Sequence, residues 1–178
     1  MTTHKTQIVY SAGVSLDGYI ADVNGGVDWL HDAMVKGESY GLDAFQKSID
    51  AVVMGSLTYE KSLEFGAGFS GKTPTWVFSR RPLKAKGKAL TVTNDSPAAV
   101  AAEMSRRGLK RAWLMGGGKL AASFLAAGLI DEISLGLMPV VLGGGIPLFH
   151  GGIRPTHLPL IESTPFKGGA FGLRFAPR

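Results

Sequence analysis

The 178 residues of the chain include 19 Lys and Arg against 14 Asp and Glu, a net charge of +5, and 45% of the residues are hydrophobic. This length and composition indicate one globular domain, residues 1–178, and exclude a disordered tail. The absence of cysteine excludes disulfide scaffolds, thiol nucleophiles and cysteine-ligated metal centres.

The net charge and the sequence at the chain ends indicate which partners and which cellular location to expect. A pI near 9.6 attracts anions in general, but the basic residues are scattered and no aromatic-interleaved basic ribbon accompanies them, so we expect no nucleic-acid partner. Residues 1–7 are polar and lack a signal sequence, and the uncharged stretch 134–153 is broken by prolines and glycine runs, so we expect a cytoplasmic protein without a membrane span. The histidines form no metal-spaced pair, and no metal site is expected.

The first half of the chain alternates apolar runs with turn residues. In chain order, the predicted elements are strands at 8–15 and 19–21, a helix over 42–49, a strand at 51–54 and a helix from residue 56. Asp17-Gly18 separates the first two strands, and a glycine-rich loop leads to Asp28-Trp29. Ser56 is expected to cap the helix that follows the strand ending at Gly55.

The second half continues the alternation and then closes with strands alone. In chain order, it adds strands at 75–78 and 90–93, a helix from Pro97 to Gly108 capped by Ser96, a strand at 112–115, a helix over 119–127 stopped by Gly128, a strand at 132–141, and strands at 158–162 and 171–175. This order predicts an α/β fold with a mostly parallel central sheet, helices on both faces and an antiparallel C-terminal hairpin.

One strand end carries the strongest signal for a ligand. Strand 112–115 runs into Gly116-Gly117-Gly118 and then Lys119 and Leu120 at a helix start. Glycines let a phosphate approach the main chain, and the helix dipole favours negative charge. A flexible turn that binds nothing is the alternative. The position far along the chain does not suit a Rossmann fingerprint, and Leu120 stands where a Walker loop needs Ser or Thr.

Two further strand ends are suited to anions. Gly55, Ser56 and Thr58 place a glycine and hydroxyls at a helix start, and Ser79-Arg80-Arg81 follows strand 75–78. Guanidinium groups bind phosphate, and an arginine near a ribose is the usual mark of 2′-phosphate recognition. Each motif alone is compatible with an ordinary cap or a solvated charge pair. Together they predict one extended phosphorylated cofactor.

The chain resembles the dihydrofolate reductase-like fold, and most closely the RibD C-terminal (pyrimidine reductase) family in its short stand-alone form. The segments that carry this resemblance are 11–21 (SAGVSLDGYIA), 28–29 (DW), 53–60 (VMGSLTYE), 78–80 (FSR), 115–119 (MGGGK), 129–132 (LIDE) and 139–149 (PVVLGGGIPLF). They follow the family order and span nearly the whole chain. The resemblance implies a three-layer fold and a homodimer that takes hydride from NADPH.

The resemblance also implies residue roles. The residues implied to bind the cofactor are Gly55, Ser56 and Thr58 at its phosphates, Ser79, Arg80 and Arg81 at the 2′-phosphate, Gly116, Gly117, Gly118, Lys119 and Leu120 along the pyrophosphate, and Gly13 and Ile20 beside the nicotinamide. Ser11 and Trp29 are implied on the substrate side. A cis peptide is expected between Gly116 and Gly117.

The expected substrate is 5-amino-6-(5-phosphoribosylamino)uracil, an intermediate of riboflavin synthesis. Gly41 occupies the position of the pterin-binding carboxylate of dihydrofolate reductases, and Thr58-Tyr59-Glu60 replaces the Asp-Pro pair usual in RibD reductases. Dihydrofolate reductase activity and a non-enzymatic nucleotide-binding module are the alternatives.

A proton must reach the acceptor as the hydride arrives, from a side chain or an ordered water. Asp17 is the candidate donor because it ends the first strand beside the expected nicotinamide. An aspartate in an Asp-Gly turn also commonly bonds to its own backbone, which is the alternative role for this residue.

Overall fold

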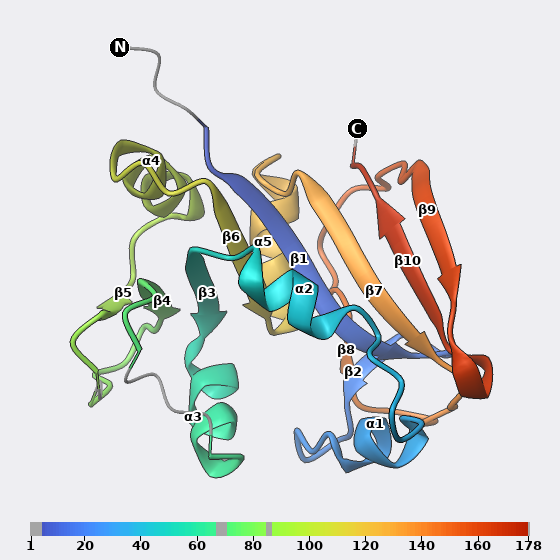
Figure 1. Ribbon diagram of the computed structural model, residues 1–178. Helices are drawn as coiled ribbons and strands as arrows, with labels where there is room; N and C mark the ends of the chain where they lie inside the picture. Colours follow the sequence, from blue (N-terminus) through green and yellow to red (C-terminus); the bar gives the residue numbers. More distant parts are fainter. Residues whose placement is uncertain (1–4, 67–70, 85–86, 178) are drawn as a thin grey trace.

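The computed structural model describes residues 5–66, 71–84 and 87–177 (Figure 1). Eight strands form one sheet in the order β5-β4-β3-β6-β1-β7-β10-β9, and β2 pairs with β8 in a separate ribbon. The strands are β1 (Gln7–Ser15), β2 (Tyr19–Ala21), β3 (Ala51–Gly55), β4 (Thr75–Phe78), β5 (Leu90–Thr93), β6 (Arg111–Gly116), β7 (Glu132–Met138), β8 (Ile146–Pro147), β9 (Leu160–Pro165) and β10 (Phe171–Phe175).

The sheet topology confirms the predicted mixed α/β architecture. All neighbouring strands from β5 to β7 run parallel, whereas β10 is antiparallel to both β7 and β9. The C-terminal hairpin therefore lies at one edge of the sheet, as Figure 1 shows in red and orange. The helices are α1 (Asp28–Ala33), α2 (Leu42–Lys47), α3 (Ser56–Glu64), α4 (Pro97–Arg106), α5 (Gly118–Ala126) and the 3-10 turn η1 (Lys167–Gly169).

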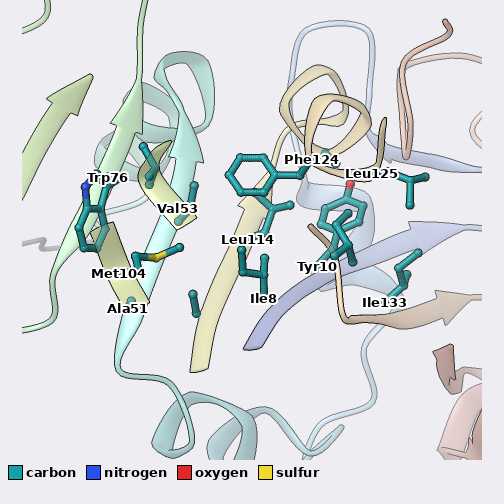
Figure 2. Close-up of a cluster of buried hydrophobic side chains, with 14 residues drawn as sticks. Ile8, Tyr10, Ala51, Val53, Trp76, Met104, Leu114, Phe124, Leu125 and Ile133 are labelled. Carbon is teal, nitrogen blue, oxygen red and sulfur yellow. The ribbon is translucent and has the colours of Figure 1, made fainter. Parts of the chain in front are cut away.

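Helices cover both faces of the sheet because side chains alternate along each strand. Val53 of β3 points into the larger core with α4 and α5, whereas its neighbours Val52 and Met54 contribute to a second cluster with Tyr59 of α3. Figure 2 shows the larger core, in which Phe124 of α5 lies against strand side chains. Burial of these apolar side chains is the main favourable term that holds the layers together.

The helix ends follow the sequence signals in part. Ser96 caps α4 by accepting a hydrogen bond from the Ala99 N–H at 3.2 Å, as predicted. The cap predicted at Ser56 is wrong, because Gly55 is the N-cap and Ser56 is the first helical residue. α1 was not predicted as a helix, and β7 ends at Met138 instead of 141.

The β2–β8 ribbon joins segments that are distant in sequence. The Leu148 N–H donates to the Gly18 carbonyl at 2.9 Å, and the phenol of Tyr10 donates to the Leu148 carbonyl at 2.8 Å. Tyr10 is fully buried, and this burial raises the pKa of its phenol. The ribbon is therefore fixed from one side by the β1–β2 turn and from the other by the core.

Candidate functional site

The strand ends singled out in the sequence lie at one edge of the sheet. β4, β3, β6 and β1 are consecutive neighbours and run parallel, so their carboxyl ends point to the same side. Gly55 pairs with Phe78 at the ends of β3 and β4, and Gly116 pairs with Met54 across β6 and β3. Open α/β sheets bind ligands in the crevice outside these ends.

Two helix N-termini meet at the junction of β3 and β6. α3 begins after Gly55 and α5 begins after Gly117, and neither helix has a side-chain cap. A Cβ added to Gly55 would lie 3.8 Å from the Gly116 oxygen and 3.9 Å from the Gly117 nitrogen. The free N–H groups and the helix dipoles make this junction favourable for an anion. Ser56 lies in the first turn of α3, and the Gly116–Gly117 peptide is cis.

Thr58 extends this junction with a hydroxyl group. A Cβ added to Gly117 would lie 3.6 Å from the Thr58 Oγ1 atom. Lys119 is exposed in the first turn of α5, whereas Leu120 packs partly buried against the large core. The junction thus combines backbone N–H groups, the Thr58 hydroxyl and the solvent-exposed ammonium of Lys119.

The chain itself approaches Gly118 closely. A Cβ at this position would overlap the carbonyl oxygen of Pro147, and the His150 N–H donates to the Gly118 carbonyl at 3.2 Å. Gly145 shows the same kind of contact, since a Cβ there would overlap the carbonyl oxygen of Ala21. Both glycines are explained by packing of the segment around β8, without a ligand.

The turn after β4 borders a shallow depression with a volume of about 500 Å³. Its lining residues are Ser79, Arg80, Arg81, Pro82, Val92, Thr93, Asn94 and Asp95. The Ser79 hydroxyl donates to the Arg81 carbonyl at 2.7 Å and holds the turn. The Arg81 Nη2 donates to both carboxylate oxygens of Glu60, at 2.7 and 2.6 Å. The sequence did not predict that Glu60 would pair with Arg81 or that Asn94 and Asp95 would line this depression, because only the sheet order brings these residues together.

Asp17 lies in the β1–β2 turn and binds groups of its own chain. Its carboxylate accepts hydrogen bonds from the Ser15 hydroxyl at 2.7 Å and from the N–H groups of Leu142 at 3.1 Å and Gly143 at 2.7 Å. These hydrogen bonds, with the one from Ser15 the largest contribution, lower the pKa of Asp17. The carboxylate therefore ties the β1–β2 turn to the loop before β8 and stays ionised at neutral pH.

The predicted nicotinamide and substrate residues lie around the second half of β1. Leu30 of α1 covers Gly13 so closely that a Cβ there would lie 2.8 Å from the leucine Cδ2. Trp29, also on α1, has a buried indole N–H without a partner among the described residues. Ser11 lies two residues before Gly13 on the same side of β1, and Ile20 is half-buried in β2. No local pattern in the sequence predicts that Leu30 covers Gly13.

Other features of the described chain lie apart from this edge. A hollow of about 330 Å³ beside Val52 and Trp113 contains none of the predicted site residues. Within the described ranges, no three His, Asp or Glu side chains gather in a way that could hold a metal ion. No helix among the described residues has the length and apolar character needed to cross a membrane.

Comparison with known proteins identifies related sequences and folds. The model of the RibD C-terminal domain family matches residues 68–171, which is more than half of the chain. The Bacillus subtilis protein YwjB is 34% identical over 163 residues, covering 91% of this chain and 92% of YwjB. The B. subtilis protein YyaP is 28% identical over 181 residues, covering 93% and 92% respectively.

Solved structures share the fold over nearly the full length. A Shewanella sp. PV-4 protein provisionally named for riboflavin biosynthesis superposes with a TM-score of 0.86 at 25% identity, covering 97% of this chain and 99% of that one. A pyrimidine reductase-like protein from Corynebacterium diphtheriae gives a TM-score of 0.69 at 16% identity, covering 99% and 94%. The family match and the identity to YwjB agree with the motifs in the sequence, and the chain belongs to the RibD C-terminal domain family.

Proposed function

We propose that the protein is an NADPH-dependent reductase that transfers hydride to a small heterocyclic substrate. The observation that carries this proposal is the pair of uncapped helix N-termini, those of α3 and α5, side by side at the β3–β6 junction. Two such ends suit a pyrophosphate, because each supplies unpaired N–H groups and the positive end of a helix dipole. Family membership supports the same cofactor class.

The order of strands at the sheet edge suits an extended dinucleotide. The depression after β4 and β5 contains Arg80 and would accept the adenosine end, and the β3–β6 junction would accept the pyrophosphate. β1 is the next strand, so Gly13 and Ile20 lie on the side where the nicotinamide ring is proposed. When bound, NADPH would supply the hydride. The chain contributes binding, orientation and exclusion of water.

The substrate side is proposed between β1 and α1, around Ser11 and Trp29. The buried indole N–H of Trp29 has no hydrogen-bond partner among the described residues, and we propose that it donates to an acceptor on the substrate, such as a ring carbonyl. The first substrate to test is 5-amino-6-(5-phosphoribosylamino)uracil. Dihydrofolate is the second candidate, although Gly41, without a carboxylate, precedes α2.

We assign Asp17 to positioning and propose that ordered water delivers the proton. A general acid works best when its pKa lies near the operating pH, whereas three hydrogen bonds lower the pKa of Asp17. If Asp17 were the donor, Asp17→Asn would reduce kcat by about a hundredfold or more. We expect a smaller reduction and an unchanged acidic limb of the pH–rate profile.

The test is hydride transfer itself. Purified protein is mixed with NADPH and either the aminouracil phosphate or dihydrofolate, and the loss of reduced-nicotinamide absorbance is followed against a control without protein. We expect oxidation with the aminouracil. Quenching of tryptophan fluorescence by NADPH without turnover of either compound would instead support a non-enzymatic nucleotide-binding module. Light scattering on the same sample tests the homodimer that we propose for the working form.

A further inference from the structure

The depression beyond β4 and β5 is lined by three charged side chains, Arg80, Arg81 and Asp95, and two of them, Arg81 and Asp95, already have hydrogen-bond partners. Arg81 donates through one guanidinium nitrogen to both oxygens of Glu60, which lies on α3. The carboxylate of Asp95 accepts a hydrogen bond from the Thr93 hydroxyl at 2.7 Å. A phosphate that enters this depression therefore meets two carboxylates as well as two guanidinium groups.

The turn after β4 also uses its hydroxyl group. The Ser79 hydroxyl donates to the Arg81 carbonyl at 2.7 Å, and the same oxygen accepts from the Arg81 N–H at 3.3 Å. These contacts fix the backbone of Arg81, which lies three residues after the end of β4. The Arg81 side chain is thus drawn toward α3 and its charge is balanced by Glu60.

Arg80 differs from its neighbour. Among the described residues, no hydrogen bond or ion pair holds its guanidinium group, and the side chain is exposed at the rim of the depression. The amide of Asn94 lies on the β5 side of the same depression and is likewise unengaged among the described residues. Of the two arginines at the depression, Arg80 is the one that can meet a phosphate without breaking an ion pair among the described residues.

We infer that Glu60 is a selectivity-determining residue, because it sequesters Arg81 and leaves discrimination of a 2′-phosphate to Arg80. The inference rests on the proposed function, in which this depression holds the adenosine ribose of NADPH. A 2′-phosphate is a dianion, whereas the corresponding group of NADH is a neutral hydroxyl. The ratio of affinities for the two nucleotides therefore reports the net charge that this depression presents to the ribose.

The experiment measures Kd for NADPH and for NADH by tryptophan fluorescence on the full chain. Glu60→Gln keeps the side-chain shape and releases Arg81, and we expect the preference for NADPH to rise about three- to tenfold. Arg80→Ala should lower the preference about tenfold, because a charge-assisted hydrogen bond is lost. Arg81→Ala alone should lower the preference by less than Arg80→Ala does, because it removes no direct phosphate contact and only leaves the Glu60 carboxylate without its partner, whereas in the Glu60→Gln background it should cancel the gain.

The matched control is Glu64→Gln. Glu64 lies on the same helix and pairs with Lys61 at 2.8 Å, so its substitution removes one negative charge from α3 without releasing an arginine at the depression. If Glu60→Gln and Glu64→Gln raise the preference equally, a general charge effect explains the result and the inference is wrong. The inference is also wrong if Glu60→Gln leaves the ratio of the two Kd values unchanged. It is likewise wrong if Arg81→Ala lowers the preference for NADPH as much as Arg80→Ala does. Absence of binding by both nucleotides would overturn the proposed function together with this inference.

Discussion

The hydrogen bonds to Asp17 make the β1–β2 turn sensitive to pH. The folded-state pKa of this carboxyl lies below the unfolded value of about 3.9, so its contribution to stability is fully present above that value. The contribution is lost as the pH falls through the folded-state pKa. Asp17→Asn should therefore lower the melting temperature by a few degrees at neutral pH and by progressively less under acidic conditions.

Thermal denaturation of wild type and Asp17→Asn from neutral to acidic pH measures this difference in melting temperature. Asp32→Asn is the control, because the Asp32 carboxylate is exposed and has no hydrogen-bond partner among the described residues. If the difference in melting temperature between wild type and Asp17→Asn stays constant down to the lowest pH, the charge of the Asp17 carboxylate is not what holds the turn.

Gly118 illustrates how a tertiary contact reverses a local preference. Alanine is favoured over glycine in helices by up to about 1 kcal/mol, and Gly118 is the first residue of α5. A Cβ there would nevertheless overlap the Pro147 carbonyl oxygen, so Gly118→Ala should lower the free energy of unfolding by about 1–3 kcal/mol. Chemical denaturation measures this change. In the control Gly151→Ala, where nothing lies within 4 Å of the added Cβ, the change should stay within about 0.5 kcal/mol.

At the scale of elements, one buried carboxylate links three strands at the sheet edge opposite the candidate site. Glu132 of β7 is 5% exposed and accepts two hydrogen bonds from Arg174 of β10, both at 3.0 Å. Arg111 of β6 approaches the same carboxylate at 3.4 Å, and the hydrogen bonds of Arg174 to Glu132, and then to Glu162, raise the pKa of Arg174. Because β1 lies between β6 and β7, this cluster spans the centre of the sheet.

Substitution of Glu132 by glutamine leaves two guanidinium groups without their shared anion. Loss of one partner from a buried ion pair costs about 3–5 kcal/mol, and the partial exposure of both arginines reduces this to about 2–4 kcal/mol for Glu132→Gln. The midpoint of urea denaturation reports the loss. Glu64→Gln, at an exposed pair, should cost less than about 1 kcal/mol, and an equal loss in both variants would contradict the role of burial.

The sequence predicted strands and long helices well, because their apolar periodicity and their turn residues are local. It did not predict α1, which has no buried residue and no side-chain cap and whose Leu30 packs on Gly13 of β1. It placed the cap of α3 one residue late, since a glycine and a serine are both acceptable caps. These errors occur where a tertiary contact or two equivalent local signals decide the structure.

The same distinction applies to the candidate site. Convergence of the strand ends could be predicted, because parallel strands present their carboxyl ends at one edge. The contacts at this edge could not be predicted. Gly118 has the sequence appearance of a phosphate-binding glycine, yet its close neighbour is Pro147, and Arg81 is engaged by a glutamate 21 residues earlier. Such contacts depend on the spatial order of the strands, which no local pattern contains.

At the scale of the whole molecule, the proposed cofactor contacts come from the ends of four neighbouring strands of one sheet. Binding should therefore stabilise the protein as a unit, and we expect a single unfolding transition for the proposed single domain. NADPH at about 100 times its Kd adds about 2.7 kcal/mol, which corresponds to a rise of roughly 5–10 °C for a chain of this size. Calorimetry with and without NADPH measures the number of unfolding transitions and the rise in melting temperature. Two separate transitions, of which NADPH shifts only one, would show that the sheet does not unfold as one unit and would contradict a binding site shared by its strands.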